Sequence, residues 1–478
     1  MKAYAKPARV ALLLATVWAA GACDDLTSLN ENKNAPDDVG AEFLLPQAIR
    51  SGAESAFGAT MMLSHTSIWP GHAVQIQYPD EETGLVRADR MDAYWNAYYA
   101  GPLSDIQTVL EKARSGNDPN REAVALIWRA WLFHQVTDLW GDVPYSEALA
   151  GRDNPRPAYD AQQDIYTGLI ADLTTAVGTM TQTGDGFGAG DILYGNSFAQ
   201  WRRFANSLRM RLAMRMVNEM AGAAETAFVA AYNAGGFQSN ADNAVVRWPG
   251  APYENPLYED YLGRDDHGIS GALVDTLKSL GDPRLELFAE PAAQDGEYRG
   301  HYNGYEAPPL SLSNYSRINN YWRANGAATP TLIMGYAEVL FLQAEAAQRG
   351  WIPASAADLY TAGIRAAMTQ FTGNAASEQE INDYLANPRV VYNPATGLQQ
   401  IHLQQWIGLF MNGGEAFAHW RRTGVPNLTP GPDLVVSRIP VRFTYPSGEQ
   451  SFNSVNLNSA LSRQGGGLDL VTPMWWMP

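Results

Sequence analysis

Apolar residues recur at spacings of three and four along most of the chain after residue 38, and this periodicity predicts α-helices. The segments that carry it are 39–67, 89–114, 120–139, 158–181, 197–221, 265–280, 330–349, 354–371, 377–386, 398–412 and 415–422. Strict alternation, which would indicate half-buried strands, is rare. We therefore expect a mainly α fold with a little β structure.

The clearest helix lies in "TPTLIMGYAEVLFLQAEAAQRGW", residues 329–351. Thr329 is expected to cap this helix, Pro330 to occupy its first turn and Gly350 to end it. The amphipathic segment 354–371 follows after a short turn. The two segments therefore predict an antiparallel pair of tetratricopeptide type, with small residues where the helices approach closely.

Residues 120–139 and 158–181 are expected to form a second pair of this kind, although no exact repeat period is visible. Long aromatic-rich segments without helical periodicity separate the helices and predict ordered loops, and they are 65–90, 237–264, 284–328 and 424–478. Within the last of these, residues 438–453 alternate enough to predict a short strand pair.

The N-terminus resembles a bacterial lipoprotein signal. Basic residues precede an uncharged apolar run at 10–22, which is too short to span a bilayer, and small residues then lead into Cys23. Because Cys23 is the only cysteine of 478 residues, it forms no internal disulfide, whereas an acyl anchor explains its place. The alternative is an ordinary secretory signal followed by an unrelated cysteine.

The expected organisation is a signal peptide at 1–22, an acylated (palmitate-type) Cys23 with a flexible tether over 23–38, and a single domain at 39–478. Asp24 and Asp25 resemble the surface-export signal of Bacteroidetes-type lipoproteins. We therefore expect a protein that is lipid-anchored in the outer membrane and faces the cell surface.

The net charge of the chain limits the classes of partner that it is expected to bind. Three of its 33 basic residues lie before residue 23, so 30 remain against 50 acidic residues, a net charge of about −20. Such a surface repels phosphate backbones, so nucleic acid is not expected as a partner.

Catalytic and metal-binding motifs are not evident. The sequence contains no HExxH, no phosphate-binding P-loop and no GxSxG, and the glycine-rich run at 184–191 has no strand before it. The seven histidines are scattered without ligand spacing. We expect no enzyme activity, no cofactor and no metal, although carboxylate pairs for glycoside hydrolysis are invisible in sequence.

Two groups of aromatic and polar residues are candidate ligand platforms, because sugar rings stack on aromatic faces while amides and guanidinium groups bind hydroxyls. The first lies within 300–322 and comprises Tyr302, Tyr305, Tyr315, Arg317, Asn320, Tyr321 and Trp322. The second comprises Trp69, Tyr78, Trp95, Asn96 and Tyr98. The alternative for either group is burial of the rings against the helical body or at a transporter interface.

Five segments, in order, resemble the SusD/RagB-like family. They are "FHQVTDLWGDVPYSEAL" (133–149), "FANSLRMRLAMRM" (204–216), "MGYAEVLFLQAEAAQRGW" (334–351), "GGEAFAHWRRTGVPNL" (413–428) and "RIPVRFTYPSGEQSFN" (438–453). The resemblance covers essentially all of the chain after Cys23. These segments look structural, and they identify a fold better than a ligand.

The resemblance implies a SusD-like helical fold and a surface lipoprotein that binds a nutrient, most often an oligosaccharide or polysaccharide. It also implies delivery of that nutrient to a SusC-like, TonB-dependent β-barrel. The alternatives are a peptide-binding lipoprotein of RagB type, an exported glycan-processing enzyme and a scaffold lipoprotein with a protein partner only.

Overall fold

The computed structural model describes residues 39–181 and 183–478. The predicted signal peptide, the acylation site at Cys23 and the tether lie outside the described residues. Ala41–Pro478 forms one compact unit.

This unit is built mainly of helices, so the predicted mainly α fold is confirmed. In its first half the helices are α2 (Ala41–Phe57), α3 (Ala59–Met61), α4 (Ala88–Tyr99), α5 (Pro102–Ser115), α6 (Pro119–Trp140), α7 (Gln162–Thr179), α8 (Phe198–Arg215), α9 (Ala221–Ala234) and α10 (Pro256–Gly263). In its second half they are α11 (Gly271–Leu280), α12 (Arg284–Phe288), α13 (Tyr336–Gln348), α14 (Ala356–Met368), α15 (Glu378–Leu385), α16 (Gly397–Gly408), α17 (Gly413–Thr423), α18 (Ser447–Phe452) and α19 (Ser454–Gln464).

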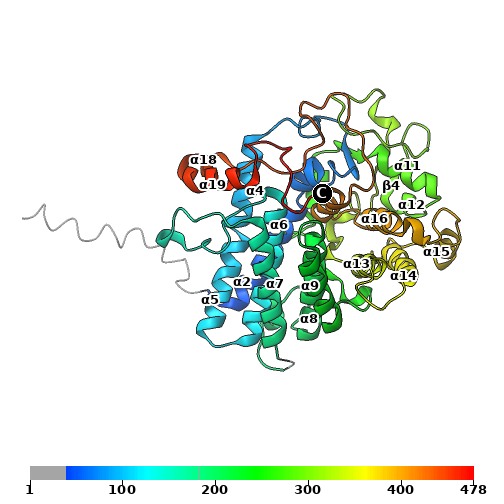
Figure 1. The fold of residues 1–478 in the computed structure, drawn as a ribbon. Helices are drawn as coiled ribbons and strands as arrows, with labels where there is room; N and C mark the ends of the chain where they lie inside the picture. The colour runs from blue at the N-terminus through cyan, green and yellow to red at the C-terminus, as the bar shows by residue number, and fades with distance from the viewer. Residues whose placement is uncertain (1–38, 182) are drawn as a thin grey trace, which may run out of the picture. The chain divides into compact units, whose positions relative to one another are not determined.

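The long helices pack in sequence order. Contacts join α2 to α5, α5 to α6, α6 to α7, α7 to α8 and α8 to α9, and α8 also packs on α13. Figure 1 shows these helices side by side in a row, with most of the loops above them. This row of packed helices supports the loops on its upper side.

Both predicted helix pairs are present. α6 packs on α7, and α13 packs on α14. Gly363 of α14 lies against the ring of Phe341, so that a Cβ at this position would come within 2.7 Å of the ring. A small residue is therefore required where α14 approaches α13, as the sequence predicted.

The predicted start of α13 is wrong. Residues Thr331–Met334 form strand β6, and the helix begins only at Tyr336, after Gly335. The β-branched residues Thr331 and Ile333 favour this strand. Thr329 does not cap the helix, since its hydroxyl donates to the backbone oxygen of Tyr321 instead.

The β structure of the described residues consists of three antiparallel two-stranded sheets. They pair β1 (Ala73–Gln75) with β3 (His267–Ile269), β2 (Ala244–Val246) with β6, and β4 (Ala289–Glu290) with β5 (Arg317–Ile318). Each sheet joins segments far apart in sequence, so single-segment patterns gave little sign of them.

The predicted strand pair at 438–453 is absent, because its backbone groups find other partners. The Phe443 N–H donates to Leu139 at the end of α6, and the Val441 N–H donates to Leu470. The alternating Val441, Phe443 and Tyr445 are all buried. The alternation therefore results from burial of side chains along an extended segment. Helix α18 follows this segment.

Some helices were not predicted from the sequence. α19 buries only Leu457 and Ala460 among polar neighbours. The alanine-rich α9 and the short α12 were also missed. Amphipathic periodicity fails where a helix buries few side chains or is uniformly small.

Charged side chains from four helices meet in the interior, and we call His134, Asp138, Arg211, Arg215, Glu338 and Glu415 the buried ion network. Arg211 donates from Nε and Nη2 to the two oxygens of Glu338, each at 2.6 Å. Arg215 lies 2.7 Å from Glu415 and 3.2 Å from Asp138. All six residues are buried.

The network is a product of helical spacing. His134 and Asp138 lie four residues apart on α6, as do Arg211 and Arg215 on α8, so each pair faces one direction. Burial alone would raise the pKa of Asp138, but Arg215 and His134 lower it below its usual range. The carboxylate is therefore ionised and fixed in place.

A second buried pair lies beside the network. Glu345 of α13 accepts hydrogen bonds from Arg422 of α17 at 2.7 and 2.8 Å, and the His402 ring lies 3.1 Å away. Four of the five sequence motifs that carry the family resemblance thus meet in these contacts. They fix the packing of α6, α8, α13 and α17.

Within residues 39–181 and 183–478, no helix is long and apolar enough to cross a membrane. In the same part of the chain, His134, Asp138 and Glu415 form the one group with ligand atoms close enough to surround a metal ion. The Arg215 guanidinium bonds to the carboxylates of both Asp138 and Glu415, so these acidic groups are already paired with a cation.

Candidate functional site

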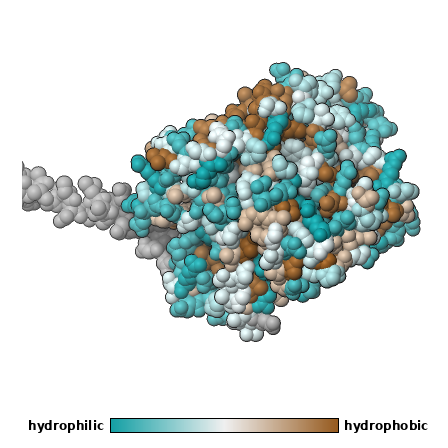
Figure 2. Space-filling model, in the orientation of Figure 1, coloured by the Kyte–Doolittle hydropathy of each residue, from teal (hydrophilic) through white to brown (hydrophobic). Residues whose placement is uncertain are grey.

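Two cavities lie among the loops above the helical row. Figure 2 shows that, on the face drawn, apolar residues gather along the upper edge, the side on which Figure 1 places most loops. Both cavities contain residues of the predicted platforms. They differ in the polarity of their walls.

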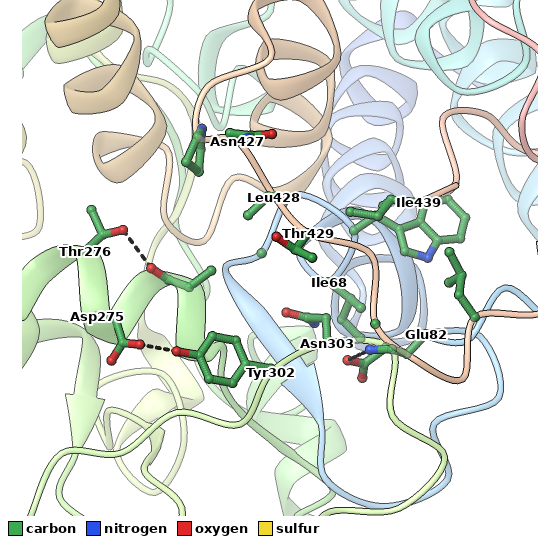
Figure 3. A pocket seen from close by; sticks show the side chains of 17 residues that line it. Ile68, Glu82, Asp275, Thr276, Tyr302, Asn303, Asn427, Leu428, Thr429 and Ile439 are labelled. Carbon is green, nitrogen blue, oxygen red and sulfur yellow. Dashed lines mark hydrogen bonds between the residues drawn. The ribbon is translucent and has the colours of Figure 1, made fainter. Parts of the chain in front are cut away.

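The first, which we call the apolar cavity, has a volume of about 280 Å³. Figure 3 shows side chains from α11, from the loops around residues 68–82 and 302–304, and from residues 426–439 converging on it. Its lining includes Ile68, Trp69, Glu82, Asp275, Tyr302, Asn303, Asn427, Leu428, Thr429, Leu434 and Ile439. Pockets that hold drug-sized ligands have volumes of about 300–1,000 Å³. The volume of this cavity is just below that range, so it suits a single ring-sized unit.

Asn303 ties three elements together beneath this cavity. Its amide nitrogen donates to the backbone oxygen of Ala73 in β1 at 2.8 Å, and its amide oxygen accepts from the Ser270 hydroxyl at 2.6 Å. Ser270 also caps α11 by accepting from the Ala272 N–H. The floor of the cavity is therefore held by the fold before any ligand arrives.

Glu82 is a buried carboxyl in the wall of the cavity. Its oxygens accept from the backbone N–H groups of Gln75 at 2.7 Å and Gly304 at 3.0 Å. Burial raises the pKa of Glu82 to about 8, although these donors oppose the shift. Burial therefore favours the protonated form of this carboxyl at neutral pH.

Tyr302 lies at the opening of the cavity. Its hydroxyl donates to Asp275 of α11, and its ring is 52% exposed. The ring passes over Gly271, where a Cβ would come within 3.0 Å of two ring carbons. Glycine at the first turn of α11 thus lets the ring lie flat against the helix while one face stays open to solvent.

Residues 426–439, which we call the strap, form the opposite wall. Gly431 packs so closely on the loop below that a Cβ would lie 2.3 Å from the Asn303 carbonyl oxygen. The Asp433 N–H donates to Gly304 at 3.1 Å, and the Val435 N–H donates to Thr83 at 2.8 Å. These contacts position Asn427, Thr429 and the apolar strap residues at the cavity.

The second cavity, which we call the polar cavity, has a volume of about 460 Å³. It is lined by Ala59, Thr60, Ser64, Gln75, Gln77, Tyr78, Asp80, Glu81, Arg87, Arg90, Asp260, Arg264, Asp266 and His267. The charges of its four acidic residues and three arginines nearly cancel. Such a lining offers many donors and acceptors and suits an uncharged polar ligand.

Tyr78 is the exposed aromatic residue of the polar cavity, with 67% of its surface open to solvent. Its φ of 54° lies in the left-handed region, which a bulky side chain rarely adopts. The Arg264 guanidinium stacks 4.9 Å from the ring centroid and is itself bound to Asp266. The ring is therefore oriented by its neighbours.

The predicted platform around Trp69 is divided by the structure. Trp69 is buried and lines the apolar cavity, with its indole N–H donating to Glu81. Trp95 and Tyr98 of α4 are 6% and 1% exposed and pack on Trp140 in the core, away from both cavities. Asn96 is exposed on the same helix but lines neither cavity.

The predicted platform at 300–322 is divided in the same way, and only Tyr302 lines a large cavity. Tyr315 and Trp322 are 4% and 3% exposed, and the Tyr321 hydroxyl donates to Thr372. Apolar packing and backbone bonds explain these positions. Of the remaining members, Tyr305 packs beside His301, Arg317 binds Asp265 and the Asn320 N–H donates to Glu290.

Sequence reasoning missed the strap and α11 as sources of site residues. Asp275, Thr276 and Thr429 lie in none of the five motifs, and Asn427 and Leu428 end the fourth motif without a sign of a ligand role. In "TPGPD" at 429–433, one glycine between two prolines is typical of a turn. Only the tertiary packing of Gly431 on Gly304 reveals why the turn lies there.

Comparison with known proteins places this geometry in a family. A SusD-like family model, described as "Starch-binding associating with outer membrane", matches residues 33–446. A solved chitin-binding protein is 30% identical, with a TM-score of 0.83 over 91% of this chain and 99% of its own. No curated protein matches the chain.

Two further solved structures show the same fold. A chitin-binding SusD homolog from Flavobacterium johnsoniae is 24% identical, with a TM-score of 0.80 over 91% of this chain and 98% of its own. A SusD homolog from Bacteroides uniformis is also 24% identical, with a TM-score of 0.80 over 91% and 99%. Since the family model covers most of the sequence, this chain belongs to the SusD-like family.

Proposed function

We propose that the protein is a surface lipoprotein that binds a carbohydrate and passes it to a SusC-like, TonB-dependent β-barrel. The observation that carries the carbohydrate proposal is Tyr302, whose half-exposed ring stands at the opening of the apolar cavity with Asp275 bound to its hydroxyl. A ring fixed in this way can stack on the C–H face of a sugar.

The second cavity supports the same ligand class. Tyr78 presents an exposed ring beside a lining in which acidic and basic groups nearly balance. Sugars are uncharged and carry many hydroxyls, so they match such a lining without a net electrostatic requirement. The family description as starch-binding and the chitin-binding relative add support.

Delivery to a barrel rests on less direct support. The family is described as associating with the outer membrane, and Cys23 has the sequence context of an acylated anchor. The acidic surface disfavours adsorption to anionic lipid, which leaves the acyl chains as the membrane link. A barrel partner would receive the ligand released from the loop side.

The binding proposal is tested with the full-length chain purified in detergent. Soluble oligosaccharides of glucose, xylose, mannose and N-acetylglucosamine are titrated calorimetrically, with oligopeptides of matched length as the comparison. Binding of an oligosaccharide supports the proposal. Binding of peptides alone would support the RagB-type alternative, and release of shortened products would identify a glycan-processing enzyme.

The partner proposal needs a separate experiment. The protein is tagged at its C-terminus and extracted gently from the outer membrane, and the co-purifying proteins are identified. A near-stoichiometric TonB-dependent barrel is expected. A different protein partner together with no soluble ligand would support the scaffold alternative, and a Cys23→Ser variant that stays in the membrane would contradict the acyl anchor.

A further inference from the structure

A third cavity lies against α2, and we call it the α2 groove. Phe43 and Arg50 of α2 line it, together with Arg247, Trp248 and Tyr253 from the segment that follows β2. Its described lining shares no residue with the apolar or the polar cavity. The volume is about 420 Å³, which is within the range of about 300–1,000 Å³ for pockets that hold small ligands.

The fold holds the walls of the α2 groove in place. Trp248 is buried, and its indole N–H donates to the Thr331 hydroxyl of β6 at 2.9 Å. The Tyr253 N–H donates to the Gly250 carbonyl oxygen at 2.8 Å in a tight turn. The Arg50 guanidinium then lies 4.5 Å from the centroid of the Tyr253 ring. The segment after β2 is therefore fixed to α2 without a ligand.

Two aromatic rings of the α2 groove are open to solvent. Phe43 is 68% exposed and Tyr253 is 47% exposed. Rings this exposed gain little from burial, and large apolar groups that are exposed together mark binding surfaces. An open ring face can stack on the C–H face of a sugar ring. The groove thus offers the aromatic surface that a sugar ring requires.

The charge of the α2 groove is opposite to that of the chain. Among the described residues, Arg50 and Arg247 line the groove and no acidic residue does, whereas the chain carries 50 acidic against 33 basic residues. Arg50 donates to Glu54 at 3.0 Å and to Gln47 at 2.5 Å, which orients it and leaves further guanidinium N–H groups for a ligand. In the part of the chain that the structure describes, the exposed Arg247 side chain forms no hydrogen bond or ion pair. Guanidinium groups match carboxylates in shape and charge, so the groove favours an acidic ligand.

We propose that the α2 groove binds acidic sugars, the uronic acid units of an oligosaccharide, through their carboxylate. This inference rests on the proposed carbohydrate-binding function and adds a second site for a different substrate class. The carboxylate pairs with Arg247 and Arg50, and the C–H face of the sugar ring stacks on Phe43. A stable protein partner would instead need about 800 Å² of surface on each side, far more than two exposed rings around one cavity.

Two ligands that differ only in charge test the inference. An α-1,4-linked galacturonic acid hexamer and the same hexamer methyl-esterified at every carboxyl are titrated into the full-length chain in detergent at low ionic strength. The acid hexamer is expected to bind at least roughly fivefold more tightly, because each arginine contributes about two- to fivefold, and to lose this advantage as salt is added. No binding of the acid hexamer, or equal affinities for the two, would overturn the inference.

Two exposed arginines supply matched variants that remove the same charge. Arg247→Gln is expected to weaken binding of the acid hexamer by about two- to fivefold, and Arg247→Gln combined with Arg50→Gln to bring the ratio of the two affinities close to one. Arg152 is exposed and absent from the described linings of all three cavities, so Arg152→Gln should leave the ratio unchanged. A ratio that survives in the double variant would show that the groove does not bind the carboxylate.

The stacking role of Phe43 has a different signature. Phe43→Ala should weaken the binding of both hexamers alike, because stacking on the ring does not depend on the charge of the ligand. Unchanged affinity for both hexamers would contradict this placement of the sugar. A thermal unfolding scan of each variant identifies any loss of affinity that comes from loss of fold.

The outcomes separate this inference from the proposed function. Tyr302→Ala, at the apolar cavity, should keep the preference for the acid hexamer. If a folded Tyr302→Ala protein loses that preference while the double arginine variant keeps it, the inference falls and carbohydrate binding at the apolar cavity stands. If the acid hexamer binds through Arg247 and no neutral oligosaccharide binds, the inference stands and the apolar cavity is not the glycan site. If no oligosaccharide binds, both fall together.

Discussion

The charged side chains between the helices and the uncharged polar side chains at the apolar cavity are arranged in opposite ways. In the buried ion network and the adjacent Glu345 pair, residues of four family motifs bond to one another and are closed to solvent. At the apolar cavity, Asn427 and Thr429 belong to an exposed loop, and only one side of Tyr302 is engaged. The polar groups of the first region are bonded to one another, whereas those at the apolar cavity remain open to a ligand.

This difference explains why the family motifs identify the fold and not the ligand. His134, Arg211, Glu338 and Glu415 each lie in one of these motifs, and removing one would leave its partner charged and buried, at a cost of several kcal/mol. The strap and α11 residues line the apolar cavity instead. The motif residues of the buried ion network therefore identify the helical body, whereas Asp275, Thr276 and Thr429 at the apolar cavity lie outside the five motifs.

The largest expected effect comes from breaking a buried ion pair. Glu345→Gln keeps the shape of the side chain but removes the charge that pairs with Arg422, so the free energy of unfolding should fall by about 3–5 kcal/mol. Chemical denaturation followed by circular dichroism measures the loss. The control is Glu378→Gln, which removes an exposed partner of Arg365 and should change stability by at most about 0.5 kcal/mol.

A loss of similar size is expected at Trp322, although the sequence places this residue in a ligand platform. Trp322→Ala deletes a ring that is 3% exposed and packs on Phe371 and Phe410, so stability should fall by about 3–5 kcal/mol. Leu310→Ala, at a residue 47% exposed in the same segment, is the control. A stable Trp322→Ala protein with weakened glycan binding would place the site elsewhere than the apolar cavity.

Glu82 should give stability a distinctive pH dependence. Its pKa is about 8 in the folded state against 4.5 in the unfolded chain, so between these values the folded protein holds a proton that the unfolded chain has lost. Stability should therefore fall as the pH rises from 4.5 to 8, by at most about 1.4 kcal/mol per pH unit. Denaturation of wild type and Glu82→Gln at pH 5, 6.5 and 8 measures it, and identical slopes would contradict the assignment.

The smallest effect is expected from removing one hydroxyl at the opening of the cavity. Tyr302→Phe keeps the ring but loses the hydrogen bond to Asp275, so ligand affinity should fall by about 0.5–1.5 kcal/mol, or roughly two- to tenfold. Calorimetric titration with the best oligosaccharide of the panel measures this change. Unchanged affinity would mean that Asp275 does not orient the ring for the ligand.

The sequence predicted the helical body well because its long helices are rich in apolar residues at helical spacing. The pairs α6–α7 and α13–α14 follow from apolar spacing alone. The start of α13 was misplaced because Thr329–Pro330 looks like a helix start, whereas β6 is stabilised by pairing with β2, almost ninety residues earlier. Such pairing leaves no local signal.

The site was predicted only in part, since aromatic content does not reveal which rings are buried. Trp69, Tyr78 and Tyr302 lie at cavities, whereas Trp95, Tyr98, Tyr315 and Trp322 pack in the core. Tyr302 and Tyr321 stand in similar sequence surroundings. Their separation depends on Gly271, which opens space for one ring, and on a backbone oxygen that holds the hydroxyl of the other.

The most direct test of the account is therefore the affinity of Tyr302→Ala against that of Tyr321→Ala for the same oligosaccharide, with unfolding temperatures measured in parallel. The account predicts that Tyr302→Ala weakens binding about tenfold or more without a large change in stability, because the ring stacks on the ligand from an exposed position. Tyr321→Ala should keep its affinity. Retained binding in Tyr302→Ala together with lost binding in a folded Tyr321→Ala would contradict the assignment of the apolar cavity as the site.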